Sequence, residues 1–216
     1  MNDKAIISAE NGWEKHWAEN NTPWDAGGPA PALDQFLTQW LKDHDPAKSR
    51  GLVPGCGRGY DVLRLAQAGI ESWGLDVAPS VRPYFEAVRA RADETTSRLS
   101  HLAIGDFLGG ALDQVPALFD VVWDYTFLCA IDLNQRPIWK HRMLQWLAPN
   151  GTLATLLYPV VPGAPLDVGP PFPLDPRAIE RLLAPEFTLH ELSAVNHSHP
   201  GREGKERLAV WRRTAS

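Results

Sequence analysis

Short apolar runs alternate with longer amphipathic stretches through most of this chain, which is the pattern of successive strand–helix units. Strands joined by helices form a parallel, doubly wound sheet, so we predict an α/β fold. The predicted strands are residues 51–54, 71–75, 99–104, 119–123 and 152–158, with terminal strands near residues 187–195 and 207–211. The predicted helices are one that ends at Gly69 and others near residues 79–98, 135–147 and 177–183.

Polar residues gather where the predicted strands end, although the strands themselves are apolar. Ligands of doubly wound sheets bind at the carboxyl ends of the strands, near the point where the strand order reverses. This edge of the sheet is therefore the expected binding site. The residues expected there are Gly55, Asp76, Asp106, Asp124, Tyr125 and Tyr158.

The first predicted strand ends in a glycine-rich turn, residues 55–59, and Asp76 follows 21 residues after Gly55. Glycines let the backbone approach a ligand closely, and an acid about 20 residues further on can accept hydrogen bonds from ribose hydroxyls. The simpler alternative is an ordinary strand-to-helix turn with a solvated Asp76. The spacing favours a nucleoside-binding site.

The glycine pattern also distinguishes between cofactors. A dinucleotide needs a third glycine beneath its pyrophosphate, at the position where this chain has Tyr60. S-adenosylmethionine has no pyrophosphate and does not need that glycine. Asp106 can bind the adenine amino group, and Phe107 can cover the face of the ring. These residues favour S-adenosylmethionine and disfavour a nicotinamide oxidoreductase.

Three tryptophans stand before the strand–helix units. Trp13 and Trp17 are spaced i and i+4, so they share one face of a helix, and Trp24 follows in a turn-like stretch. One interpretation is a helix that only packs on the core. The other is a lid whose indoles lie near the positive sulfonium and exclude water from the transfer. Both interpretations give the fold an N-terminal helical cap, over residues 1–49.

Composition narrows the class of protein without revealing a reaction. The chain has 216 residues, of which 44% are hydrophobic and 22% are charged, and a formal net charge of −5. This size predicts one domain over residues 1–216, with a Rossmann-like core at residues 50–216. The negative charge argues against binding to nucleic acid or to an anionic membrane. The sequence shows no signal peptide or membrane span, and its two cysteines favour a reduced, cytoplasmic monomer.

Short motifs follow one another along almost the whole chain. They are Gly12-Trp13 through Trp17 to Thr22-Pro23-Trp24-Asp25, Leu52-Val53-Pro54-Gly55-Cys56-Gly57, Gly74-Leu75-Asp76, Phe119-Asp120 through Asp124-Tyr125, Phe127 to Ile131, Leu157-Tyr158-Pro159, Gly169-Pro170-Pro171-Phe172 and Gly204-Lys205-Glu206-Arg207-Leu208. Together they resemble the halide/thiol methyltransferases, which belong to the thiopurine methyltransferase superfamily. The proline-rich segment 160–176 departs from the plant-like pattern, which leaves the acceptor open.

The resemblance implies a Rossmann-like class I methyltransferase fold, with a mostly parallel seven-stranded sheet, that uses S-adenosylmethionine. The implied acceptors are halides, thiocyanate, hydrosulfide and small thiols, or aromatic thiols in the thiopurine branch. Tyr158 and Tyr125 are the predicted catalytic residues, because they would face the acceptor. With the glycine turn and the fourth strand end included, the predicted cofactor-binding residues are Trp13, Trp17, Trp24, Gly55, Cys56, Gly57, Asp76, Asp106, Phe107, Asp124 and Tyr125.

The chemistry needs no general base if the acceptor already carries a negative charge, because displacement at a sulfonium methyl then depends on alignment and desolvation. No catalytic triad is evident in the sequence, and no metal is expected. His197 and His199 are interpreted as part of a solvated loop rather than as a metal pair. Cys56 is interpreted as a small packing residue rather than a reactive thiol.

Two other functions stay open from the sequence alone. A methyltransferase acting on oxygen or nitrogen of a larger metabolite would need a base, and His101, His141 or His190 would have to reach the site. A module that binds an adenosyl nucleotide without turnover would share the same cofactor residues.

Overall fold

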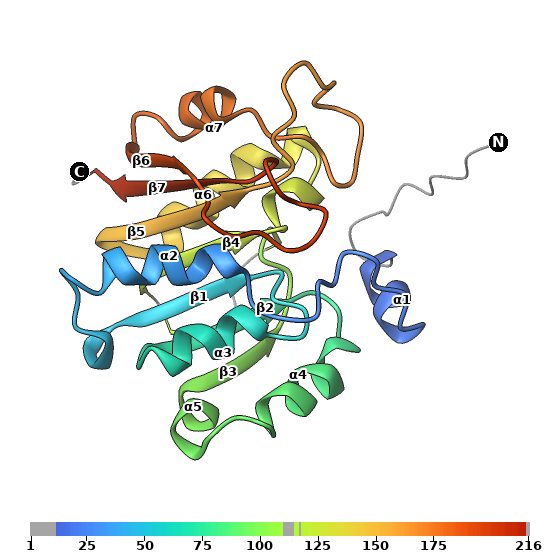
Figure 1. Ribbon diagram of the computed structural model, residues 1–216, viewed down its shortest axis with the longest axis vertical. Coiled ribbons are helices and arrows are strands. Elements are labelled where there is room, and N and C mark those ends of the chain that lie inside the picture. The colour runs from blue at the N-terminus through green and yellow to red at the C-terminus, as the bar shows by residue number, and fades with distance from the viewer. Residues whose placement is uncertain (1–11, 110–114, 117, 215–216) are drawn as a thin grey trace.

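A seven-stranded sheet forms the centre of the computed structural model, which describes residues 12–109, 115–116 and 118–214 (Figure 1). The strand order is β3-β2-β1-β4-β5-β7-β6; the first five strands run parallel, and β7 pairs antiparallel with both of its neighbours. The expected mostly parallel seven-stranded sheet is confirmed. The strands are β1 (Arg50–Pro54), β2 (Glu71–Asp76), β3 (Ser100–Ile104), β4 (Phe119–Tyr125), β5 (Leu147–Leu157), β6 (Phe187–Ala194) and β7 (Arg207–Arg213).

Helices cover both faces of this sheet (Figure 1). The helices are α1 (Gly12–Ala18), α2 (Pro31–Trp40), α3 (Tyr60–Gln67), α4 (Val81–Arg89), α5 (Glu94–Leu99), α6 (Arg136–Trp146) and α7 (Pro176–Leu183), with 3-10 turns η1 (Pro46–Lys48), η2 (Leu128–Ala130) and η3 (Leu133–Gln135). The apolar faces of α2, α3 and α4 pack on one side of the sheet, and those of α6 and α7 pack on the other.

The strand sequences supply both cores because successive side chains point to opposite faces. In β4, Val121 and Trp123 pack with α2 and α3, whereas Val122 between them packs with α6. Trp123 is fully buried and donates its indole N–H to Asp61 of α3 at 2.9 Å. This bond fixes α3, and therefore the turn that precedes it, against the end of β4.

Several element boundaries differ from the sequence prediction, and β5 begins at Leu147, five residues before the predicted strand 152–158. The single helix expected over residues 79–98 is two helices, α4 and α5, because Asp93 adopts an extended conformation and accepts the backbone N–H of Thr96 at 2.9 Å as an N-cap. The fourth strand was expected to end at Trp123 but continues through Tyr125, which places Asp124 and Tyr125 inside the sheet.

The predicted N-terminal helices are present, and α1 lies apart from α2, beyond the edge where the parallel strands end (Figure 1). Trp17 of α1 is only 3% exposed, and the hydroxyl of Tyr84 in α4 donates to its carbonyl oxygen at 3.2 Å. Glu14 accepts hydrogen bonds from the backbone N–H and the hydroxyl of Ser80, at 3.1 and 2.5 Å. The segment before α2 therefore packs on the carboxyl end of the sheet.

The glycine turn allows a test of local packing. Gly59 caps α3 with φ +79°, and a Cβ atom there would overlap the buried ring of Phe85. Gly163 has the same φ, but no atom lies within 4 Å of its Cβ position. We expect Gly163→Ala to lower the free energy of unfolding by about 1–2 kcal/mol through backbone strain alone. Gly59→Ala should cost about 1–3 kcal/mol more through overpacking, as measured by urea unfolding. Equal losses would contradict this role of Phe85.

Candidate active site

The strand order reverses between β1 and β4, because β1 is followed along the chain by β2 on its other side. A cleft opens at the carboxyl ends of these strands and encloses about 780 Å³, its open mouth included. This strand-end cleft lies where doubly wound sheets bind ligands. It is lined by Trp13, Trp17, Trp24, Gly55, Leu75, Asp76, Val77, Gly105, Asp106, Phe107, Leu108, Phe127, Ala130, Ile131 and Gln135.

Asp76 lies at the end of β2 and is held rigidly. Its two carboxylate oxygens accept the backbone N–H groups of Gly57 and Ala78, each at 3.0 Å. Burial raises the pKa of this carboxyl to about 6, although these two hydrogen bonds lower it. Each carboxylate oxygen keeps a free lone pair, so the ionised group can accept further hydrogen bonds from a ligand hydroxyl.

The floor of the cleft is apolar and aromatic. Phe107 and Phe127 pack edge to face, with ring centroids 5.4 Å apart. Gly55 lets Phe127 approach the turn, because a Cβ atom there would lie 2.6 Å from that ring. Asp106 accepts the backbone N–H of Leu108 at 2.8 Å and adds a second carboxylate to the wall. A flat, largely apolar base with a hydrogen-bond donor on its edge would fit between these groups.

The three N-terminal tryptophans close one side of the cleft. The ring of Trp24 packs edge to face with those of Trp13 and Trp17, at centroid distances of 5.0 and 6.1 Å. The guanidinium of Arg58 already lies 5.6 Å from the ring centroid of Trp17 and 4.4 Å from that of Tyr84. Trp17 therefore has a cation of the protein beside it, whereas Trp13 and Trp24 make no such contact with a described residue.

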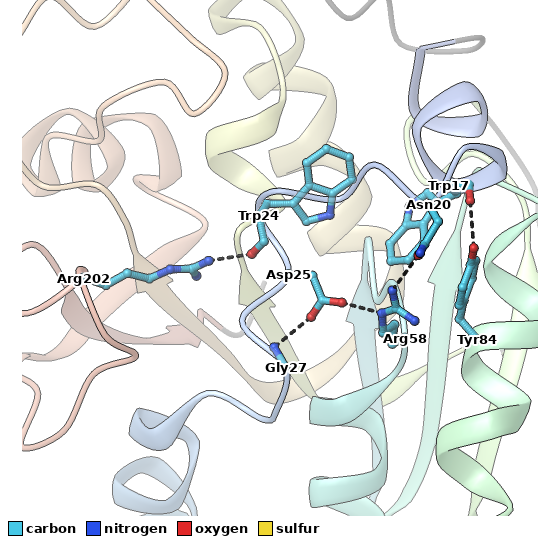
Figure 2. A network of polar contacts seen from close by, with 8 residues as sticks. All are labelled: Trp17, Asn20, Trp24, Asp25, Gly27, Arg58, Tyr84 and Arg202. Carbon is cyan, nitrogen blue, oxygen red and sulfur yellow. Dashed lines mark hydrogen bonds and ion pairs between the residues drawn. The ribbon is translucent and has the colours of Figure 1, made fainter.

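Two arginines from the core hold the segment around Trp24 (Figure 2). Arg58, in the glycine turn, pairs with Asp25 and donates to the side chain of Asn20 at 3.1 Å. Arg202, in the loop between β6 and β7, donates to the carbonyl oxygen of Trp24 at 2.6 Å. The segment is thus tied on one side to the start of α3 and on the other to the C-terminal part of the sheet.

A second cavity adjoins the strand-end cleft and shares Trp17, Trp24 and Gly55 with it. The other side chains that line it include Asp25, Cys56, Arg58, Tyr60, Asp61, Tyr125, His199 and Arg202. The Tyr125 hydroxyl donates to Glu206 at 2.6 Å and accepts a hydrogen bond from Arg202. Two compartments with a common wall are therefore present, and the second has more charged side chains in its lining than the first.

Most of the predicted site residues lie around these two compartments. Ten of the twelve line one compartment or both: Trp13, Trp17, Trp24, Gly55, Asp76, Asp106 and Phe107 line the cleft, and Cys56, Gly57 and Tyr125 line only the second cavity. Burial raises the pKa of the Cys56 thiol well above its ordinary value, which keeps it protonated.

Asp124 and Tyr158 are placed differently from the others, since neither lines the cleft or the second cavity. Asp124 is 1% exposed, and its oxygens accept the backbone N–H of Leu128 at 3.0 Å and the indole N–H of Trp139 at 2.8 Å. This carboxylate points into the sheet–α6 core because β4 is longer than predicted. Tyr158 lies beneath Arg202, whose guanidinium is 4.9 Å from its ring centroid.

The structure corrects the interpretation of His199. We expected His197 and His199 to share a solvated loop; His197 is exposed, but His199 is buried, 8% exposed, and its ring lies nearly parallel to that of Tyr125. Of the other histidines considered, His101 stacks on Trp73 beside Glu71, and neither it nor His141 or His190 lines the cleft or the second cavity.

Arg58, Arg202, His199 and Glu206 are the site residues that sequence reasoning did not assign. Arg58 stands in the glycine turn, so its position was a usable signal. The other three lie in a loop without apolar periodicity, and only the pairing of β7 with β5 brings this loop to the site. Their chemistry could not be placed without that long-range pairing.

The family model described as thiopurine S-methyltransferase matches residues 8–214. The chain belongs to this family. It is 34% identical over 207 residues to thiocyanate methyltransferase 1 of Arabidopsis thaliana, a match covering 94% of this chain and 85% of that protein. It is 30% identical over 216 residues to probable thiol methyltransferase 2 of the same plant, covering 97% and 88%.

Solved structures agree on the fold. The 1,6-didemethyltoxoflavin N1-methyltransferase of Burkholderia thailandensis superposes with a TM-score of 0.73 at 16% identity, covering 98% of this chain and 88% of that one. The class I methyltransferase fold is thereby confirmed. At the level of the family, so are the expected enzyme class and cofactor, a methyltransferase that uses S-adenosylmethionine. Within the described residues, every helix is too short or too polar to span a bilayer.

The position of Asp76 leads to a prediction about the cofactor. Asp76→Ala should weaken binding of S-adenosylmethionine, because a charged acceptor contributes roughly 1.5–3 kcal/mol for each ribose hydroxyl it binds. Isothermal titration calorimetry measures the change. Asp93→Ala is the control, since it also removes a carboxylate that accepts a backbone N–H but lies outside both compartments.

The pKa of Asp76 adds a pH dependence to this test. Since burial raises that pKa to about 6, the carboxylate is ionised at pH 7 and becomes protonated as the pH falls through 6. Affinity in the unmodified protein should therefore weaken below pH 6, and this step should vanish in Asp76→Ala. Unchanged affinity in the variant at pH 7 would remove Asp76 from the ribose site.

Proposed function

We propose that this methyltransferase transfers the methyl group of S-adenosylmethionine to a small sulfur or halide nucleophile, such as a thiol, hydrosulfide, thiocyanate or iodide. The observation that carries the proposal is the pair of adjoining compartments, with an aromatic cleft at the strand ends on one side and a cavity lined by charged side chains on the other. Their common wall of Trp17, Trp24 and Gly55 is where donor and acceptor would meet.

The strand-end cleft fits the cofactor. Asp76 would bind the ribose hydroxyls, Asp106 would accept from the adenine amino group, and the Phe107–Phe127 pair would cover the base. The glycine turn lies between the cleft and the second cavity, so the methionine part would follow it. S-adenosylmethionine supplies an electrophilic methyl group, and the residues around it align the acceptor and exclude water.

The second cavity fits an anionic or polarisable acceptor. Arg58 forms an ion pair with Asp25, but the hydrogen bonds of Arg202 are to neutral groups, the Tyr125 hydroxyl and the Trp24 carbonyl. Arg202 therefore leaves positive charge available at the cavity wall. The aromatic rings of Tyr125 and Tyr158 flank this guanidinium at 5.2 and 4.9 Å, so weakly hydrated anions lose little by entering.

The two tyrosines would act in different ways. Tyr125 donates its hydroxyl hydrogen to Glu206, and burial together with this bond raises its pKa, so it stays a neutral phenol that positions Arg202. Tyr158 does not line the second cavity itself but lies beneath Arg202, and its side chain makes no hydrogen bond with a described residue, so its hydroxyl would act on the acceptor from behind this guanidinium. Neither group would need to remove a proton from an acceptor that is already an anion.

The N-terminal segment would act as a lid over the bound cofactor. Trp13 and Trp24 line the cleft, no cation among the described residues lies over either ring, and the contacts of Arg58 and Arg202 hold the segment in place (Figure 2). A sulfonium near an indole face gains about 0.5–2 kcal/mol. The single sheet with its N-terminal cap is also the basis on which we propose one domain for the whole chain.

Replacing Trp13 tests the lid. If its indole faces the sulfonium, Trp13→Ala should weaken binding of S-adenosylmethionine about two- to thirtyfold, and binding of S-adenosylhomocysteine, whose sulfur is uncharged, by less. Calorimetric titration of both ligands gives the ratio. Trp73→Ala is the matched control, because it removes another half-buried indole on β2 that lies outside the cleft. Unchanged affinity for both ligands would reduce Trp13 to a packing residue.

Replacing Arg202 tests the acceptor. Arg202→Gln should lower kcat/KM for thiocyanate and iodide roughly 10- to 100-fold, because a hydrogen bond to a charged group contributes about 1.5–3 kcal/mol. Tyr158→Phe should have a smaller effect, about 0.5–1.5 kcal/mol, with cofactor affinity kept. Arg212→Gln on β7 is the control. Wild-type preference for a bulky aromatic thiol over all small acceptors would instead indicate the thiopurine-type acceptor.

A further inference from the structure

The second cavity is lined by a buried histidine, His199, whose ring nitrogens have no hydrogen-bond partner among the described residues. His199 is 8% exposed, and its ring lies 6.3 Å from that of Tyr125 with an interplanar angle of 13°. Its backbone carbonyl accepts the N–H of Arg202, which starts the turn that carries Arg202 to the cavity. The imidazole is therefore fixed in position beside the residue that we propose to attract the acceptor.

No hydrogen bond to a described residue engages the His199 ring. Nε2 is buried and has no hydrogen-bond partner, and Nδ1 makes no hydrogen bond with a described residue. Buried polar atoms are nearly always hydrogen-bonded in folded proteins, so an unpartnered one at a cavity requires an explanation. His101 also has an unpartnered Nε2, but it lies 3.4 Å from a carboxylate oxygen of Glu71. At His199 the missing partner is consistent with a ligand of the second cavity.

Burial and a nearby positive charge keep the His199 ring neutral. Burial and the positive charge of Arg202 lower its pKa below the ordinary value, against smaller opposite effects of Glu206 and Asp25. Glu206 is itself buried, with one oxygen bonded to the Tyr125 hydroxyl and the other unpartnered. A neutral imidazole has a free lone pair on one nitrogen at pH 7 and can accept a proton.

Small thiols differ from thiocyanate and iodide in one respect that matters here. A thiol with a pKa of about 8.5, the value of free cysteine, is only roughly 3% thiolate at pH 7, and the thiolate is the nucleophile. We propose that His199 is the general base for neutral thiols bound in the second cavity. The S–H bond breaks, the proton passes to the free ring nitrogen, and the electron pair stays on sulfur as the thiolate that attacks.

This inference rests on the proposed function and divides its acceptors into two groups. Thiols need His199, whereas thiocyanate and iodide have no proton to lose. The proton on the imidazole leaves to solvent after the neutral thioether departs, which restores the base. A base for a protonated acceptor would thus be His199, which the sequence analysis assigned to a solvated loop.

The wild-type pH profile provides the first test. With His199 as base, kcat/KM for 2-mercaptoethanol should rise only until the pH passes the imidazole pKa. Since that pKa is lowered by burial, the plateau should be reached before pH 7. Without a base it should follow the thiolate fraction and rise tenfold per pH unit up to the pKa of the thiol. A profile that follows the thiolate fraction through pH 8 would overturn the proposal.

A matched pair of variants provides the second test. At pH 7, His199→Gln should lower kcat/KM for 2-mercaptoethanol relative to that for thiocyanate by at least tenfold, and by up to roughly 30-fold for a thiol of pKa about 8.5. His197→Gln, the same change two residues away on an exposed side chain, should leave the ratio unchanged. Equal losses for both acceptors in His199→Gln would mean that His199 only supports the cavity.

A third measurement does not depend on turnover. The NMR titration of the His199 imidazole in the protein with S-adenosylhomocysteine should show a pKa below 6.5 that rises when 2-mercaptoethanol binds, and the resonance should be absent in His199→Gln. A pKa that the thiol does not change would count against the base. If the wild type methylates neither acceptor, the proposed function fails, whereas this titration still decides whether His199 contacts a bound thiol.

Discussion

The guanidinium of Arg202 holds together three parts of the chain that are far apart in sequence. It donates to the Trp24 carbonyl in the N-terminal segment and to the Tyr125 hydroxyl at the end of β4, and it lies over the ring of Tyr158 just after β5. Each of these groups is neutral, so the cation is oriented without being neutralised by a direct ion pair. The wall between the two compartments and the positive charge of the second cavity both depend on this one side chain.

Two carboxylates do corresponding work, Asp61 in the wall of the second cavity and Asp76 in the strand-end cleft. Asp61 accepts the backbone N–H of Ala30 at 2.7 Å and the indole N–H of Trp123, and Asp76 accepts the N–H of Gly57. Burial raises the pKa of both to about 6, so both are ionised near neutral pH. Their hydrogen bonds anchor the start of α2 and the glycine turn to the sheet, which fixes the shape of the strand-end cleft before any ligand arrives.

The sequence was sufficient where the signal is local or follows strand order. The apolar runs gave β1 and β2 to within a residue, and the distance from Gly55 to Asp76 placed that acid at the cleft. It was insufficient where a contact crosses the sheet. Asp124, like Asp76, was predicted to follow an apolar strand, yet its carboxylate points to Trp139. The reason is that β4 continues in the sheet through Tyr125. His199 gave no signal, since its burial depends on β7 lying between β5 and β6.

The division of the site into two compartments separates the residues placed to bind the nucleoside from those placed to choose the nucleophile. Asp76 of β2 and Asp106 after β3 line only the strand-end cleft, whereas His199 and Arg202 reach the second cavity from a single loop between β6 and β7. On the proposed function, substitutions in that loop change the acceptor site without altering the groups placed to hold the nucleoside. Trp24 cannot vary as freely, because it contributes to both compartments. Divergence of acceptor preference among related enzymes, and its engineering in this one, should therefore concentrate in the C-terminal loop.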